Sequence, residues 1–359
     1  MSAPELDVSR DAATIAQAVC DIESVSGNET VLADAIERVL RDTPHLHVFR
    51  DGDALVARTE FGRAQRVLIA GHIDTVPVNV NLPVRRERRD GIEVLVGRGT
   101  VDMKSGIAVA LKLATQLSDP HVDVTWVFYD HEEVESSLNG LGRLARHRPE
   151  IFDADFGILC EPTNAVVEGG CNGTMRVDVR ARGTRAHSAR AWKGDNAIHK
   201  LGVALTRLSD FAATTVTVDG LDYRESLSAV AVSGGVAGNV IPDDAVLSVN
   251  YRFAPATTVD QAREFLEKFF GEFEVTVTDA APGARPGLDA QLARDFCDAV
   301  GAPAAPKYGW TDVARLSEMG IPAVNFGPGD PSLAHADDEH VAVDQILTVE
   351  RILRGWLSR

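Results

Sequence analysis

The feature that most constrains the fold is a short buried strand followed directly by acidic or imidazole side chains, which occurs several times along the chain. The strands of this kind are Arg66–Ala70, Val122–Tyr129, Phe156–Leu159 and Pro322–Phe326. Between the first two strands, Met103–Leu117 carries apolar residues at helical spacing. This alternation of strands and helices predicts an α/β fold with a central mixed sheet flanked by helices.

The middle of the chain has a different pattern. Thr174–Gly183 alternates strictly between apolar and polar residues, which is typical of a strand with one wet face. The next predicted elements are a helix, two strands, a helix and a strand, at Asn196–Leu208, Ser226–Val232, Ala245–Phe253, Val259–Phe270 and Phe273–Thr278. This β-α-β-β-α-β order predicts an α+β, ferredoxin-like domain at 174–280, inserted into a catalytic domain formed by 1–173 and 281–359.

Charge and composition exclude several classes of protein. The 359 residues include 36 basic and 53 acidic ones, a net charge of −17. We therefore expect neither nucleic acid nor a membrane as a partner, because both bind through positive surface. No apolar run approaches the roughly 18 residues of a membrane helix, and Met1–Arg10 lacks the pattern of a leader peptide. These features favour a cytoplasmic protein. The four cysteines show no Cys-x-x-Cys spacing, so neither a disulfide framework nor a thiolate zinc site is expected.

Side chains suited to metal binding lie at the ends of the predicted strands or in the loops after them. Carboxylates and imidazoles offered by several loops, with no cysteine among them, suit zinc, cobalt or manganese. Because one ion would use three such ligands, the surplus predicts two ions that share a carboxylate. The candidates are His72, Asp74, Asp102, Glu132, Glu133, Glu161 and His335.

Each of these residues alone is weak evidence, because a single His or Glu after a strand is more often a cap, a turn former or a solvated side chain. The adjacent Glu132 and Glu133 are more informative, since two buried carboxylates repel each other unless a divalent cation lies beside them. In a loop, one of the two can bind a metal ion while the other reaches a bound water.

At these residues the chain resembles a known family. Five segments match, in order, the dinuclear metallopeptidase and deacylase family of carboxypeptidase G2, and the resemblance covers essentially the whole chain, including the inserted domain. The segments are Gly71–Pro77, Gly97–Gly106, Glu132-Glu133, Glu161-Pro162-Thr163 and the late His335. Within the second segment, Lys104 and Ser105 are expected to have structural roles at a helix start.

Carried over to this sequence, the resemblance implies two metal ions per subunit, most simply zinc, with cobalt or manganese as alternatives. It implies that Asp74 orients the imidazole of His72. It implies that Glu132 is the general base. The implied ligands are His72, Asp102 and Glu161 for one ion, and Asp102, Glu133 and His335 for the other.

The resemblance also gives roles to the inserted domain. The segment Arg185–Ala189 is similar to the family segment whose histidine reaches the active site of the partner subunit. This implies a homodimer formed through a lid domain, in which His187 stabilises a tetrahedral oxyanion. Without the resemblance, a surface histidine beside a strand end would be an equal interpretation. The implied substrate contacts are Asn239, Arg252 and Thr311.

Two departures from the common motifs indicate a branch of the family. His131 precedes the acidic pair, and Cys171 and Asn172 stand where the proteobacterial form carries two arginines. Both resemble the actinobacterial branch that hydrolyses N-succinyl-L,L-2,6-diaminopimelate, a small N-acyl amino acid, toward lysine and peptidoglycan. Acetylornithine deacetylation and dipeptide hydrolysis remain open as alternatives. A non-catalytic metal-binding scaffold is the alternative of another class.

Overall fold

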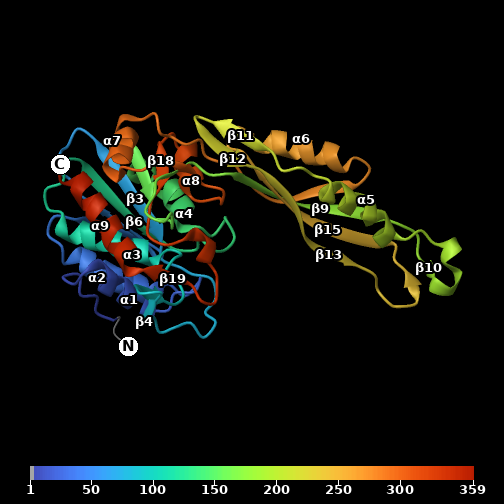
Figure 1. Ribbon diagram of the computed structural model, residues 1–359, viewed down its shortest axis with the longest axis horizontal. Helices are drawn as coiled ribbons and strands as arrows, with labels where there is room; N and C mark the ends of the chain where they lie inside the picture. Colours follow the sequence, from blue (N-terminus) through green and yellow to red (C-terminus); the bar gives the residue numbers. More distant parts are fainter. Residues whose placement is uncertain (1–3) are drawn as a thin grey trace. The chain divides into compact units, whose positions relative to one another are not determined.

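The structure is a computed structural model that describes residues 4–359 (Figure 1). Packing divides these residues into two compact units. Unit 1 contains the chain up to Gly169 with Pro286–Ala305 and Thr311–Arg359, and unit 2 contains Gly170–Arg285 with Pro306–Trp310. The domain limits expected from the sequence, 174 and 280, stay predictions. The first three residues of Met1–Arg10, where no leader peptide is expected, lie outside the described residues.

Unit 1 is built on an eight-stranded mixed sheet. Its strands are β1 (His47–Asp51), β2 (Ala54–Arg58), β3 (Arg66–His72), β6 (Asp123–Tyr129), β7 (Phe156–Leu159), β8 (Glu168–Gly169), β17 (Ala305–Pro306) and β18 (Ala323–Asn325). Their order is β1-β2-β6-β3-β7-β18-β8-β17. The four central strands, β6, β3, β7 and β18, are parallel, whereas β2 and β8 pair antiparallel with their inner neighbours. The mixed α/β fold predicted from the sequence is confirmed.

A smaller three-stranded sheet contains a hairpin that the sequence prediction did not include. It consists of β4 (Arg85–Arg89), β5 (Ile92–Val96) and β19 (His340–Ala342), in the order β19-β5-β4. Asp90 and Gly91 join β4 to β5, and both have positive φ, 50° and 82°. A two-residue turn of this kind favours Asp-Gly, so the sequence does carry a hairpin signal here.

Helices cover both faces of the large sheet (Figure 1). The helices of unit 1 are α1 (Ala12–Asp21), α2 (Thr30–Arg41), α3 (Lys104–Gln116), α4 (Gly140–His147), α7 (Gln291–Val300), α8 (Val313–Glu318) and α9 (Val343–Leu357), with the 3₁₀ turns η1 (Pro149–Phe152) and η3 (Pro331–Leu333). The buried α3 packs against α1, α9 and β3, whereas α4 and α8 pack on the other face. Among the described residues, no helix is long and apolar enough to cross a membrane.

Unit 2 is a four-stranded antiparallel sheet in the order β13-β15-β9-β16. Its elements are β9 (Gly173–Arg182), β10 (Ala186–His187), η2 (Ser188–Lys193), α5 (Ala197–Ser209), β11 (Thr215–Val218), β12 (Leu221–Arg224), β13 (Ser226–Gly234), β14 (Val240–Ile241), β15 (Asp244–Phe253), α6 (Val259–Phe270) and β16 (Glu274–Ala281). The apolar residues of β9 lie under α5 and α6 in one core. The β11–β12 hairpin, whose turn is Asp219-Gly220, is absent from the sequence prediction.

Candidate metal centre

The candidate ligands meet at one edge of the large sheet. His72 is the last residue of β3, Glu132 and Glu133 follow the end of β6, and Glu161 lies two residues beyond β7. Because β3, β6 and β7 are parallel, their carboxyl ends lie side by side, and that edge is where open α/β sheets form their sites. Asp102 comes from the loop before α3, across a cis peptide bond to Met103.

Asp102 lies between two imidazoles. Its Oδ1 atom is 3.2 Å from Nε2 of His72, and its Oδ2 atom is 3.3 Å from Nε2 of His335. The same Nε2 atom of His335 lies 3.1 Å from Oε1 of Glu133. The two oxygens of one carboxylate therefore face two separate groups of ligands.

In the described part of the chain there are three sets of residues whose donor atoms, within each set, lie within 4.8 Å of one another. All three sets are in unit 1. The spacings of 3.2 and 3.3 Å around Asp102 are close to the roughly 3.4 Å edge of a tetrahedron with ligands about 2.0–2.1 Å from a zinc ion. Nitrogen and oxygen donors at this spacing fit a pair of divalent ions. The sets are His72, Asp102 and Glu161; Asp102, Glu133 and His335; and His72, Glu132 and Glu133.

A hydrogen bond fixes the orientation of the His72 ring. Its Nδ1 atom is 3.0 Å from the backbone carbonyl oxygen of Asp74 and 3.5 Å from the Asp74 carboxylate. A proton on Nδ1, donated to that carbonyl, leaves Nε2 unprotonated and directed at Asp102. The side chain of His72 is buried, so water does not compete for it.

The carboxylate of Asp74 holds the backbone of the loop after β6. Its Oδ1 atom accepts a hydrogen bond from the N–H of Glu132 at 3.0 Å, and its Oδ2 atom accepts one from the N–H of Glu133 at 3.1 Å. The hydroxyl of Ser26 donates to Oδ2 at 2.7 Å. Asp74 therefore contacts both the imidazole of His72 and the acidic pair.

A second buried carboxylate supports the same loop from the other side. Glu29 accepts a hydrogen bond from the N–H of His131 at 3.2 Å, and the imidazole of His131 lies 2.7 Å from Asp130. His131 has a positive φ of 58°, which a residue with a side chain rarely adopts. No sequence signal singled out Glu29, because it lies at the start of α2, about a hundred positions from the loop.

The ionisable groups of the centre perturb one another strongly. Burial raises the pKa of Glu132 well above its ordinary value, and the nearby carboxylates of Asp312, Glu161 and Glu133 act in the same direction against His72. Burial alone would raise the pKa of Asp102 too, but hydrogen bonds with the two histidines hold it below its ordinary value. A concentration of negative charge of this kind is what divalent cations relieve.

Lys104 and Ser105 are buried at the start of α3, where they contact backbone carbonyls and one hydroxyl. The buried Nζ of Lys104 donates to the carbonyl of Ile22 at 2.7 Å and to the hydroxyl of Ser24 at 3.0 Å. The hydroxyl of Ser105 donates to the carbonyl of Thr100 at 2.6 Å. Burial lowers the pKa of Lys104 to about 8. These contacts are consistent with the structural roles expected from the sequence.

Thr311 is buried in unit 1, where its hydroxyl donates to the Oδ1 atom of Asn325 at 2.8 Å. Asn325 ends β18, so Thr311 lies at the same edge of the sheet as the metal-ligand candidates. Its role as a substrate contact stays a prediction.

The remaining predicted residues belong to unit 2 and lie at opposite ends of its sheet. His187 and Asn239 are neighbours, because β10 pairs with β14 and the N–H of Ser188 donates to the carbonyl of Asn239. Arg252 pairs with Thr174 near the other end of β9. The ten residues of β9, at about 3.3 Å each, span roughly 30 Å. One copy of unit 2 therefore does not place His187 and Arg252 around the same small molecule.

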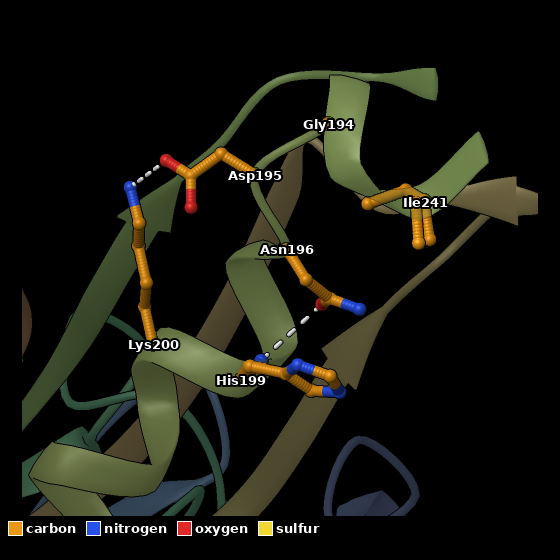
Figure 2. A pocket seen from close by; sticks show the side chains of 7 residues that line it. Gly194, Asp195, Asn196, His199, Lys200 and Ile241 are labelled. Carbon is orange, nitrogen blue, oxygen red and sulfur yellow. Dashed lines mark hydrogen bonds and ion pairs between the residues drawn. The ribbon is translucent and has the colours of Figure 1, made fainter. Parts of the chain in front are cut away.

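A cavity of about 370 Å³ lies beside the His187 segment (Figure 2). Asn196 caps the start of α5 there, accepting hydrogen bonds from the N–H groups of Ile198 and His199. Lys200 forms an ion pair with Asp195, drawn as a dashed line in Figure 2. These polar groups are paired with one another, and the cavity contains none of the predicted site residues.

Comparison with known proteins places the chain in a family. The model of peptidase family M20/M25/M40 matches residues 68–359. The chain belongs to this family.

Two relatives and one solved structure are similar to the chain over nearly its whole length. A Mycobacterium tuberculosis protein with the provisional name succinyl-diaminopimelate desuccinylase DapE is 50% identical over 98% of this chain and 99% of its own. The succinyl-diaminopimelate desuccinylase of Corynebacterium glutamicum is 47% identical over 99% of this chain and 98% of its own. A tripeptidase from Staphylococcus aureus, 21% identical, shares the fold with a TM-score of 0.77 over 99% of this chain and 98% of its own.

Proposed function

We propose that this chain is a metal-dependent amidohydrolase that converts N-succinyl-L,L-2,6-diaminopimelate into succinate and L,L-2,6-diaminopimelate, a cytoplasmic step toward lysine and peptidoglycan. One observation carries the hydrolase: the two carboxylate oxygens of Asp102 face His72 and His335 separately, as a ligand shared by two ions requires. The substrate is inferred from the names of relatives that are 47% and 50% identical over nearly the whole chain.

The proposed metal ligands are the two donor sets that share Asp102. One set adds His72 and Glu161, and the other adds Glu133 and His335. Each set offers one imidazole and two carboxylates, which suits zinc, with cobalt or manganese as alternatives. Divalent ions bound there would acidify a water molecule and polarise the amide carbonyl of the substrate.

Glu132 is the proposed general base. Its carboxylate takes a proton from water as the water oxygen bonds to the amide carbon, and it returns that proton to the amine nitrogen as the carbon–nitrogen bond breaks. Burial and neighbouring carboxylates raise the pKa of Glu132, and this makes it a better proton acceptor near neutral pH. Asp74 accepts a hydrogen bond from the backbone N–H of Glu132 and so fixes the backbone position from which the Glu132 carboxylate extends.

We propose further that the active form is a homodimer joined through unit 2. His187 in β10 follows the last residue of β9, and Arg252 in β15 pairs with Thr174 near the first, so a site that uses both has to take them from two chains. His187 would then stabilise the oxyanion in the partner's site, while Arg252 would pair with a substrate carboxylate in its own.

The edge of the unit 2 sheet offers a surface for that contact. Within residues 4–359, β13 pairs only with β15, and its Val230 and Val232 are 58% and 63% exposed. Ile198 and Leu205 of the adjacent α5 are also exposed. An exposed apolar edge strand readily pairs with another strand, and a second copy of β13 would extend the sheet across a twofold axis.

A substrate panel tests the proposed function. Zinc-loaded protein is assayed with N-succinyl-L,L-2,6-diaminopimelate, N-acetylornithine and a set of dipeptides, and the released amine is quantified. We expect the succinyl compound to give the highest kcat/KM, with activity lost in a chelator and restored by zinc. Higher kcat/KM for acetylornithine or for a dipeptide would reassign the substrate, and no turnover of any compound would favour the non-catalytic scaffold.

A further inference from the structure

A buried ion pair lies beside the candidate metal centre, and the proposed chemistry does not use it. Nη1 of Arg98 is 2.7 Å from Oε2 of Glu339, and the two side chains are 4% and 1% exposed. Burying both charges costs desolvation energy that their attraction often fails to recover, so such a pair is a poor source of stability in itself. Its contacts point to another use.

Glu339 is bonded to the loop that carries Asp102. Its Oε1 atom accepts hydrogen bonds from the N–H of Val101 at 2.9 Å and from the N–H of Asp102 at 3.1 Å. Its backbone carbonyl accepts a third, from the N–H of Gly97 at 2.9 Å. Three bonds thus fix the backbone from which the Asp102 carboxylate extends.

Arg98 reaches the loop that carries the second imidazole. Its guanidinium donates to the carbonyl of Ala336 at 3.4 Å and to the carbonyl of His335 at 3.5 Å. Its Nε–H donates to the carbonyl of Pro77 at 3.2 Å, in the loop after β3. The ion pair therefore connects the backbone of the loop that carries Asp102 with the backbone of the loop that carries His335.

The two proposed ion sites differ in how their ligands are held. His72 ends β3 and Glu161 follows β7 closely, so the sheet itself positions both. His335 lies on a loop, is 53% exposed and has a positive φ of 65°. The spacing between Asp102 and His335 depends on loop contacts, and those contacts converge on Arg98 and Glu339.

We propose that Arg98 and Glu339 are positioning residues that keep the donor atoms of Asp102 and His335 close enough to bind the same metal ion. Breaking the pair weakens binding of the ion held by Asp102, Glu133 and His335 more than binding of the ion held by His72, Asp102 and Glu161. The proposal rests on the proposed function, because it presupposes that both ions bind.

Zinc titration of the metal-free protein, with a competing chromophoric chelator, tests this without an activity assay. The variants are Glu339→Gln, Arg98→Met and the double variant. We expect each single variant to bind one zinc ion nearly as tightly as the unmodified protein and to lose about 10–100-fold in affinity for the second, the usual effect of removing a residue that supports a ligand. Because the two residues act as one unit, the double variant should lose little more than either single variant.

Asp123→Asn is the matched control. Asp123 is also a buried carboxylate that accepts two backbone N–H groups, those of Phe61 and Arg63 at 2.8 Å, but it lies at the opposite end of β6 from the metal centre. This variant should lower the thermal midpoint and leave both zinc affinities unchanged. An equal loss of zinc affinity in Asp123→Asn, or unchanged affinities in the Arg98 and Glu339 variants, would overturn the positioning role.

The unmodified protein separates the two proposals. Failure to bind a second zinc ion would count against the proposed function and this inference together. Two ions bound, with no difference between the unmodified protein and Glu339→Gln, would refute this inference alone. Thermal unfolding of each metal-free variant shows whether it folds, and a variant that does not fold is replaced by the shorter change Glu339→Asp, for which the same loss of second-ion affinity is expected.

Discussion

Oδ1 of Asp74 accepts a hydrogen bond from the backbone N–H of Glu132, at 3.0 Å. The proposed orienting carboxylate and the proposed base are therefore joined directly, although 58 positions separate them. Asp74 also accepts the N–H of Glu133 through its second oxygen. The side chain of Asp74 thus supports the backbone of both acidic residues, and its backbone carbonyl orients the His72 ring.

The substitution Asp74→Asn should reduce activity because an amide has only one acceptor oxygen. One of the two N–H groups at Glu132 and Glu133 then lacks its partner, which costs roughly 1–3 kcal/mol when the group is buried. We expect kcat to fall by about 10–100-fold. Steady-state kinetics measure this, and Ser26→Ala, which removes only the third bond to Asp74, should have a smaller effect. Wild-type kcat in Asp74→Asn would contradict the role of this contact.

The substitution Glu132→Gln should separate catalysis from metal binding. Glutamine cannot accept the proton of the attacking water, so we expect kcat to fall by about 10²–10⁴-fold or more. Metal content should stay near that of the unmodified protein, as measured by inductively coupled plasma mass spectrometry. A parallel loss of metal would mean that Glu132 is a metal ligand. Its donor atom does lie within 4.8 Å of those of His72 and Glu133.

Heterodimers of two inactive variants test whether His187 acts across subunits. His187→Ala and Glu132→Gln should each be nearly inactive alone. A heterodimer purified through two different tags has one complete site if His187 serves the partner subunit, so it should show about half of the wild-type turnover. No recovery of activity would place His187 in the site of its own chain.

Val232→Asp is the companion experiment, because a charge on the exposed edge of β13 should prevent pairing with a second copy. We expect a monomer with low activity in sedimentation velocity and kinetic assays. Val31→Asp, at an exposed position of α2 in unit 1, should remain dimeric and active. A fully active monomer of Val232→Asp would rule out the requirement for two chains.

Asp123 gives a pH dependence with a defined sign. Burial alone would raise its pKa, but hydrogen bonds from the Phe61 and Arg63 N–H groups outweigh burial and lower it. A pKa lowered by folding stabilises the protein above the unfolded value of about 3.9, and this contribution is lost as the pH falls through the folded value. Asp123→Asn should therefore cost about 1–3 kcal/mol at pH 7 in urea unfolding. The difference from the unmodified protein should shrink toward pH 3, and a constant difference would contradict this account.

The sequence carried enough information to find the ligand candidates because they follow strand ends. His72, Glu133 and Glu161 each come directly after a run whose apolar composition marks a buried strand, and parallel strands bring such positions together. Asp102 and His335 lie in loops farther from a strand end, and their assignment as metal ligands came from the family resemblance.

The groups that support those ligands could not be found in the same way. Glu29 and Glu339 act through backbone N–H groups distant in sequence, and hydrogen bonds of that kind impose no spacing on the chain. Arg98 lies inside a glycine-rich motif, but nothing in that motif identifies its partner. The missed hairpins are different, because Asp90-Gly91 and Asp219-Gly220 are turn signals that the sequence does show.

Anomalous diffraction at the zinc edge, from crystals of the zinc-loaded protein, tests the central claim most directly. We predict two peaks, one on either side of the Asp102 carboxylate. One peak should lie within about 2.0–2.2 Å of ligand atoms of His72 and Glu161, and the other within the same distance of Glu133 and His335. A single peak, or a second peak not bound by His335, would contradict the shared-carboxylate site on which the proposed hydrolysis depends.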